Sequence, residues 1–119
     1  MLKINGHELE FDLFDLESAQ VYEKALAGVT KVIDEKIMDD SVFLSQSIIL
    51  QCDAVRTFFD DMFGEGVGIS VCGETYHLTK HLDAFDALIS EAIRQRKEFD
   101  ERGRRYTEEL GTVLPVQSE

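Results

Sequence analysis

Cys72, His77 and His81 are the residues of this chain whose types and spacing come closest to a site for chemistry. They follow a Cys-x4-His-x3-His pattern, and two histidines four residues apart share a helix face on which both can ligate a metal. A structural zinc site takes four ligands, and no second cysteine lies near this pattern. We therefore interpret the three as turn and helix-start residues, and we expect neither a metal site nor a bound cofactor.

Motifs for catalysis and nucleotide binding are missing from the sequence. It has no Gly-x-Ser-x-Gly nucleophile elbow, and neither Cys52 nor Cys72 has the surroundings of a catalytic nucleophile. The glycine-containing stretch 64–68 lacks the Gly-Lys-Ser/Thr of a phosphate-binding loop and follows a predicted helix instead of a strand. The many carboxylates are typical of solvated helix faces. We therefore predict that the protein is not an enzyme and has no catalytic residues.

The charge of the chain is strongly negative and unevenly distributed. Its 119 residues contain 24 Asp and Glu against 12 Lys and Arg, a formal net charge of -12. Residues 1–93 hold 18 acids and 6 bases, whereas residues 94–119 hold 6 of each. Because an acidic body repels phosphate backbones, we expect no direct nucleic-acid binding. The sequence shows neither a membrane-spanning apolar stretch nor a secretory signal, which predicts a cytoplasmic protein without membrane contacts.

Two groups of residues are candidates for contacts with other proteins. The first belongs to an aromatic cluster at the end of a predicted helix, most of which we expect in the core, with one or two side chains facing outward. The second lies in or next to the basic stretch 94–105, which is either a solvated helix with cations at the negative end of its dipole or a contact region for a partner or another copy. The candidate partner-binding residues are Phe58, Met62, Phe63, Arg102, Arg104, Arg105 and Tyr106.

The N-terminus is predicted to form a β-hairpin. Asn5-Gly6 is the preferred pair for a two-residue type I′ turn, since both positions need positive φ. Closing the chain there pairs Leu2 with Leu9 and gives the hairpin one apolar face, made of Leu2, Ile4, Leu9 and Phe11. An isolated hairpin is marginally stable, so this face must rest on another element.

Apolar residues at spacings of three and four predict three helices. The first is capped by Asp15 and spans 15–37, and the second follows a polar break at residues 39–41 and stops at Gly64. The third runs from Thr79 to about Gly103, with its buried side made of Leu82, Phe85, Ile89, Ala92, Ile93 and Phe99. Residues 69–78 fit either a small second hairpin around Gly73 or a short irregular helix. The predicted fold is mainly α with a small β part: one domain over 1–103 and a flexible tail over 104–119.

Two parts of the chain resemble a known family. They are residues 1–26, with the Asn-Gly turn, and the stretches FFDDMFGEG (58–66) and HLDAFDALISEAI (81–93). These resemble small acidic proteins encoded in the tail-gene modules of phages and prophages of Gram-positive bacteria, which by position and size are similar to tail assembly chaperones. The resemblance implies binding to the tape-measure protein, recruitment of tail-tube subunits and no hydrolysis. The chain departs from the family pattern around residues 67–77 and in its C-terminal tail.

The function we expect is therefore a non-enzymatic tail assembly chaperone in the cytoplasm of a bacterial host. Its implied partners are the tape-measure protein and the tail-tube protein, and self-association into a homo-oligomer is compatible with its wide apolar helix faces. High net charge keeps a binder of apolar segments soluble. The alternative is an acidic inhibitor that presents carboxylates as phosphate mimics to a host nucleic-acid-binding protein. Strong salt dependence of binding distinguishes that mimic from a chaperone with apolar contacts.

Overall fold

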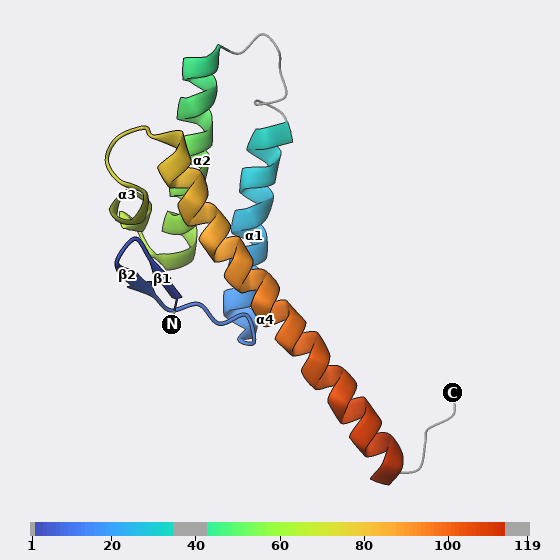
Figure 1. The fold of residues 1–119 in the computed structure, drawn as a ribbon. Coiled ribbons are helices and arrows are strands. Elements are labelled where there is room, and N and C mark those ends of the chain that lie inside the picture. Colours follow the sequence, from blue (N-terminus) through green and yellow to red (C-terminus); the bar gives the residue numbers. More distant parts are fainter. Residues whose placement is uncertain (1, 35–42, 114–119) are drawn as a thin grey trace.

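The protein is mainly helical with a small β part in its computed structural model, which describes residues 2–34 and 43–113 (Figure 1). The elements in chain order are β1 (Leu2–Ile4), β2 (His7–Leu9), α1 (Leu16–Val32), α2 (Leu44–Phe63), α3 (Val67–Cys72) and α4 (Leu78–Val113). The predicted fold class is confirmed. The described residues add a short fourth helix, α3, to the three long helices that the sequence predicts.

The N-terminal hairpin forms in the predicted register, with Leu2 opposite Leu9. Asn5 and Gly6 have φ values of 49° and 83°, the left-handed conformation that a type I′ turn requires. The side-chain amide of Asn5 donates a hydrogen bond of 2.8 Å to the carbonyl oxygen of Val71, which fastens the turn to α3. The hairpin thus rests on the helices through the turn and through its buried side chains Ile4, Leu9 and Phe11.

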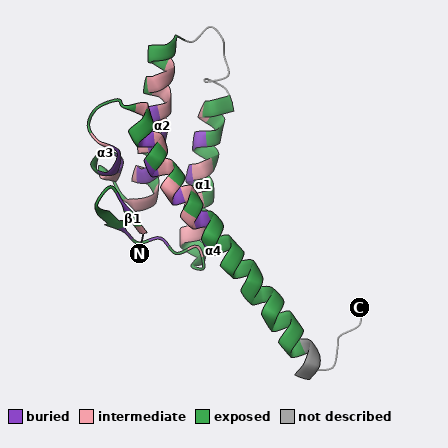
Figure 2. Ribbon diagram, viewed as in Figure 1, coloured by how far each residue is buried: buried purple, intermediate pink, exposed green. Residues whose placement is uncertain are grey.

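Helices α1 and α2 lie side by side, and α2 supplies the centre of the core (Figures 1 and 2). The Asp15 carboxylate caps α1 as predicted, by accepting a hydrogen bond of 3.0 Å from the backbone nitrogen of Ser18. Residues 35–37 of the predicted helix and the polar break at 39–41 lie outside the described residues. Gly64 ends α2 with a φ of 120°, as predicted. Phe58 and Phe59 on α2 are 1% and 0% exposed, so this helix is central.

The second hairpin considered for residues 69–78 is wrong, because Val67–Cys72 forms the short helix α3. Its backbone crosses α2 so closely that a Cβ on Gly68 would lie 2.4 Å from the Arg56 carbonyl oxygen. The Gly68 backbone nitrogen also donates a 2.7 Å hydrogen bond to the Asp60 carboxylate. The neighbours Val71 and Cys72 are both buried, a pattern of one helix face and not of an alternating strand.

The predicted end of the third helix near Gly103 is wrong, because α4 continues to Val113. A glycine inside a helix costs only about 1 kcal/mol relative to alanine. Arginine, glutamate and leucine, which favour helix, make up half of residues 104–113, and the first proline comes only at position 115. The first ten residues of the predicted flexible tail are therefore helical, and residues 114–119 lie outside the described residues.

The buried face of α4 also differs from the prediction. Ala92 is buried as predicted, and three other predicted residues are half-buried: Leu82, Phe85 and Ile89. Ala84 and Leu88 are also buried, whereas Ile93 and Phe99 are 64% and 54% exposed. Phe99 is exposed because α4 leaves the body of the protein halfway along its length (Figure 1). Ile93 is exposed for another reason: it points away from the helix face that the buried Ala92 and Gln95 share. A helix of 36 residues is about 54 Å long, more than the body can cover. The radius of gyration, 18.4 Å, accordingly exceeds the value of about 13.5 Å for a compact domain of this length.

Candidate protein-interaction surface

The residues of the Cys-x4-His-x3-His pattern are engaged in structural contacts. His81 is fully buried, and its Nδ1 donates a 2.8 Å hydrogen bond to the carbonyl oxygen of His77. Its Nε2 accepts a 3.0 Å hydrogen bond from Nε of Arg56, so both ring nitrogens are occupied. Burial lowers the pKa of His81, in keeping with a neutral ring. Within the described residues, no group of three or more His, Cys, Asp or Glu side chains is placed to hold a metal ion.

Arg56 joins this histidine to the loop that follows α3. Its guanidinium donates hydrogen bonds of 3.2 Å and 3.1 Å to the carbonyl oxygens of Gly73 and Thr75. The same group lies 4.4 Å from the ring centre of Tyr76, whose hydroxyl donates a 2.9 Å hydrogen bond to Asp53. Each contact connects α2 with the 73–76 loop, so the cluster fixes the path of the chain between α3 and α4.

The two cysteines are poor nucleophiles in this fold. Cys52 and Cys72 are both 0% exposed and are not joined in a disulfide. Burial raises the pKa of both thiols, and that of Cys72 reaches about 11. A thiol must lose its proton to react, so these side chains act as small apolar core residues.

The structure separates the two predicted groups of partner-binding residues. Phe58 lies in the core, where its ring packs against Phe59 and Phe85 with centroid distances of 5.5 Å and 5.1 Å. It is therefore not available to a partner in this structure. Met62 and Phe63 are half-buried against the same core. The other four residues are exposed and lie together on the part of α4 that leaves the body: Arg102, Arg104, Arg105 and Tyr106.

We call residues 96–113 of α4 the arm, because every side chain described there is exposed (Figure 2). Large apolar side chains nevertheless recur along it: Phe99, Tyr106 and Leu110 are 54%, 50% and 53% exposed. Together with Gly103 their spacing is four, three and four, which places all four residues on one face of the helix. We call this face the seam. An apolar stripe on a solvated helix is typical of a surface that binds another helix.

The seam leads into a groove between α4 and the start of α1. The groove has a volume of about 440 Å³, and its apolar lining includes Phe14, Tyr22, Ile93 and Phe99. The rings of Phe14 and Phe99 meet edge to face with a centroid distance of 5.6 Å. Seam and groove therefore form one continuous apolar surface with aromatic side chains, the residue type most often found at the energetic centre of protein interfaces.

Gln95 holds the segment between β2 and α1 against α4 and so forms one wall of the groove. Its side-chain nitrogen donates a 2.8 Å hydrogen bond to the carbonyl oxygen of Phe11, and its oxygen accepts one of 2.7 Å from the backbone nitrogen of Leu13. Gln95 is only 7% exposed. Sequence reasoning misses this residue, since one glutamine in a polar helix carries no signal of its own.

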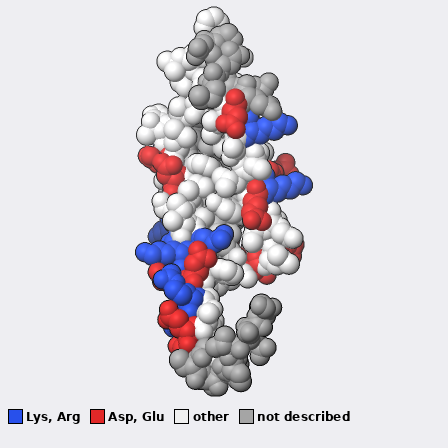
Figure 3. Space-filling view, turned by 90° about the vertical axis from the view of Figure 1, so that its right-hand side faces the viewer, with Lys and Arg blue, Asp and Glu red and all other residues white. Residues whose placement is uncertain are grey.

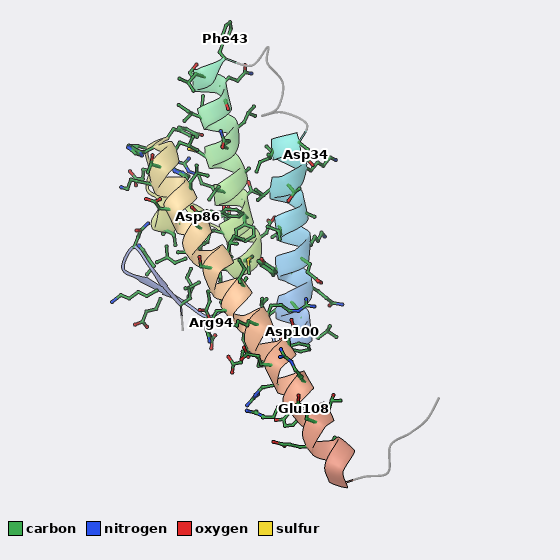
Figure 4. All side chains as sticks on the ribbon, turned by 45° about the vertical axis from the view of Figure 1, so that its right-hand side comes forward. Asp34, Phe43, Asp86, Arg94, Asp100 and Glu108 are labelled. Carbon is green, nitrogen blue, oxygen red and sulfur yellow. The ribbon has the colours of Figure 1, made fainter. Side chains whose placement is uncertain are left out.

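Charged side chains surround the seam. Arg94 forms ion pairs of 2.7 Å and 3.3 Å with Glu91 and Glu98, and hydrogen bonding to Arg94 lowers the pKa of Glu91 to about 2. Farther along, Arg96 pairs with Asp100 at 3.2 Å. Lys and Arg side chains gather on the lower part of the molecule in Figure 3, interspersed with Asp and Glu. Figure 4 shows Arg94, Asp100 and Glu108 at successive positions as α4 leaves the body.

Fold and site together describe a small, mainly helical protein with one exposed, amphipathic helical arm. Among the described residues, no helix combines the length and the apolar character needed to cross a membrane. The chain belongs to a family of unknown function (DUF6673), whose model matches residues 5–112. The match covers the turn and second strand of the hairpin, all four helices of the described residues and nearly all of the arm, whereas β1 precedes it. No curated protein and no solved structure matches the chain.

Proposed function

We propose that this protein is a non-enzymatic assembly chaperone of a phage or prophage tail, active in the cytoplasm of the bacterial host. It holds a helical segment of the tape-measure protein on the seam and groove, and it recruits tail-tube subunits as the tube grows. The tail and its two partners rest on the resemblance of residues 1–26, 58–66 and 81–93 to proteins of tail-gene modules. The proposed mode of binding is argued from the exposed apolar residues of the arm.

The observation that supports a binding role is the exposed apolar surface of α4. Phe99, Tyr106 and Leu110 are each about half exposed, although they lie on one face of a helix. A continuous exposed apolar patch that is bordered by charged residues often marks a protein–protein contact. A helix laid against this stripe buries the three side chains and extends the packing that α4 makes inside the body.

The charge distribution supports a role as a soluble carrier. Residues 1–93 have a net charge of -12, from 18 acids and 6 bases, and residues 94–119 are neutral. Copies of such a body repel one another, which opposes aggregation while an apolar segment is bound. The neutral arm can approach a partner without that repulsion.

Co-expression with the cognate tape-measure protein tests this function. The wild-type chain should keep the tape-measure protein soluble, and replacing Tyr106 and Leu110 with alanine should return most of it to the insoluble fraction. The matched control replaces Glu101 and Glu108 with alanine, on the opposite face of the same helix. Alanine favours helix in both variants, so the arm persists in each.

Two outcomes contradict the proposal. One is tape-measure protein that stays insoluble despite abundant wild-type chain. The other is capture of basic host proteins that is lost when the salt concentration is raised, because this is the behaviour of a phosphate mimic and not of an apolar seam.

A further inference from the structure

No contact within the described residues of the chain explains why residue 103 is a glycine. It lies inside α4 on the exposed arm, where glycine weakens a helix relative to alanine. A Cβ at this position would meet no atom of the described residues within 4 Å, and its φ is not in the left-handed region. Gly103 lies on the seam between Phe99 and Tyr106. A missing side chain at this place leaves room for a large side chain of another helix.

We propose that this room is filled by a second copy of the chain, and that two arms pair antiparallel about a two-fold axis beside residues 104 and 105. Phe99, Gly103, Tyr106 and Leu110 follow the alternating spacing of the core positions of a coiled coil. In an antiparallel pair centred on this axis, Gly103 of each copy faces Tyr106 of the other. Phe99 of each copy then faces Leu110 of the other. The seam is thus complementary to itself in shape, small against large at its centre.

Charge selects this register. Arg102 and Glu109 occupy equivalent positions, seven residues apart, at one edge of the seam. With the axis beside residues 104 and 105, Arg102 of each copy lies near Glu109 of the other, which gives two opposite-charge contacts per pair. A shift of one helix by seven residues in one direction sets Arg102 against Arg102. The same shift in the other direction sets Glu109 against Glu109, so both alternatives bring like charges together.

The acidic bodies favour the antiparallel orientation over the parallel one. Pairing over residues 96–113 gives an overlap of 18 residues, about 27 Å, with one body at each end. This separation exceeds the Debye length of about 8 Å at physiological salt, so the two bodies are screened from each other. Parallel arms place the bodies side by side, set Gly103 against Gly103 and bring Arg102 near the uncharged Thr107.

The pairing does not depend on the proposed function, although it uses the same seam. A chain that functions as a tail chaperone must then exchange its second copy for the tape-measure segment. Self-association would keep the seam covered until the partner arrives.

Sedimentation equilibrium of the purified full chain, from about 1 µM to 1 mM, tests the pairing. We expect the wild type to form a dimer and no larger species. Arg102→Glu alone and Glu109→Arg alone should each weaken the dimer about tenfold, because two attractive contacts become repulsive, and the double variant R102E/E109R should restore it. Circular dichroism of these surface variants should match the wild type. A monomer across the whole range overturns the proposal, as does a dimer that the charge reversals leave unchanged.

Disulfide trapping tests the orientation independently. The cysteines of the native chain are buried, so a cysteine introduced on the arm reacts selectively. An equimolar mixture of Phe99→Cys and Leu110→Cys should give the mixed disulfide under mild oxidation. Rapid formation of a 110-to-110 disulfide in the second variant alone contradicts the antiparallel pairing, because antiparallel arms hold the two copies of residue 110 about 16 Å apart along the helix axis, whereas parallel arms bring them together.

Discussion

Replacement of Gly68 by alanine tests how the glycine-rich segment is folded between α2 and α3. A Cβ on Gly68 would lie 2.4 Å, 2.7 Å and 2.9 Å from the carbonyl oxygen, Cα and carbonyl carbon of Arg56. All three are backbone atoms of a helix, so no side-chain rotation relieves the overlap. The two helices must separate by about 1 Å to reach ordinary contact, which strains the hydrogen bond from Gly68 to Asp60 and loosens the packing of Val71.

The expected magnitude follows from two opposing terms. Overpacking of this kind costs about 1–3 kcal/mol and more where backbone must move, whereas alanine gains up to about 1 kcal/mol over glycine in a helix. We expect Gly68→Ala to lower the free energy of unfolding by about 2–3 kcal/mol. Gly28→Ala is the matched control, since Gly28 lies in α1 and its Cβ would meet no atom of the described residues within 4 Å. That variant should be stabilised by about 0.5–1 kcal/mol.

Urea unfolding followed by circular dichroism at one fixed protein concentration measures the contrast. With a slope of roughly 1–2 kcal/mol per molar urea, the two variants should differ in midpoint by about 2 M. A Gly68→Ala chain as stable as the Gly28→Ala chain would refute the close crossing of α3 over α2, and with it our explanation of why residue 68 is a glycine.

Three further predictions concern buried side chains. Gln95→Leu leaves a backbone carbonyl and a backbone amide of segment 11–13 without partners, so thermal unfolding should show a loss of about 3 kcal/mol, whereas Gln20→Leu on the exposed face of α1 should change little. Burial lowers the pKa of His81 in the folded state, so the unfolded chain binds more protons than the folded chain below about pH 6.5. The free energy of unfolding should therefore fall from pH 7.5 to 5.5, and it should fall less steeply in the His81→Gln variant. Cys52 and Cys72 should resist a thiol reagent at pH 8 in the native chain and both react in urea, and rapid labelling of the folded chain would contradict their burial.

The parts of the fold that depend on neighbouring residues in the sequence were predictable. The Asn5-Gly6 turn fixes the hairpin and its register by local backbone geometry, and Asp15 and Gly64 mark helix ends through local hydrogen bonds and φ values. The short helix α3 is not predictable in this way, because it depends on the close approach of Gly68 to Arg56, twelve residues away. A glycine placed for close approach and a glycine placed for a turn look the same in a single sequence.

The candidate site was predicted in part. The basic stretch and Tyr106 lie on the segment that carries the seam, but Gly103 resembles a helix end in the sequence, so the apolar residues on its two sides do not read as one repeat. The spacing of Phe99, Tyr106 and Leu110 was the signal that reveals the seam. The exposure of Phe99 was not predictable, because periodicity gives the apolar face of a helix and not the point at which the helix leaves the body. Phe58 is the opposite case: its sequence position suggests a contact with a partner, but its side chain lies in the core.

Hydrogen–deuterium exchange, at a concentration where the free chain is monomeric, shows whether the proposed tape-measure partner binds the seam and groove. The partner should slow amide exchange along residues 93–110 of α4 and around Phe14, where seam and groove lie, and leave the hairpin at residues 2–9 unchanged. Slowed exchange confined to the hairpin or to α3, with the arm exchanging as in the free chain, would contradict this mode of binding.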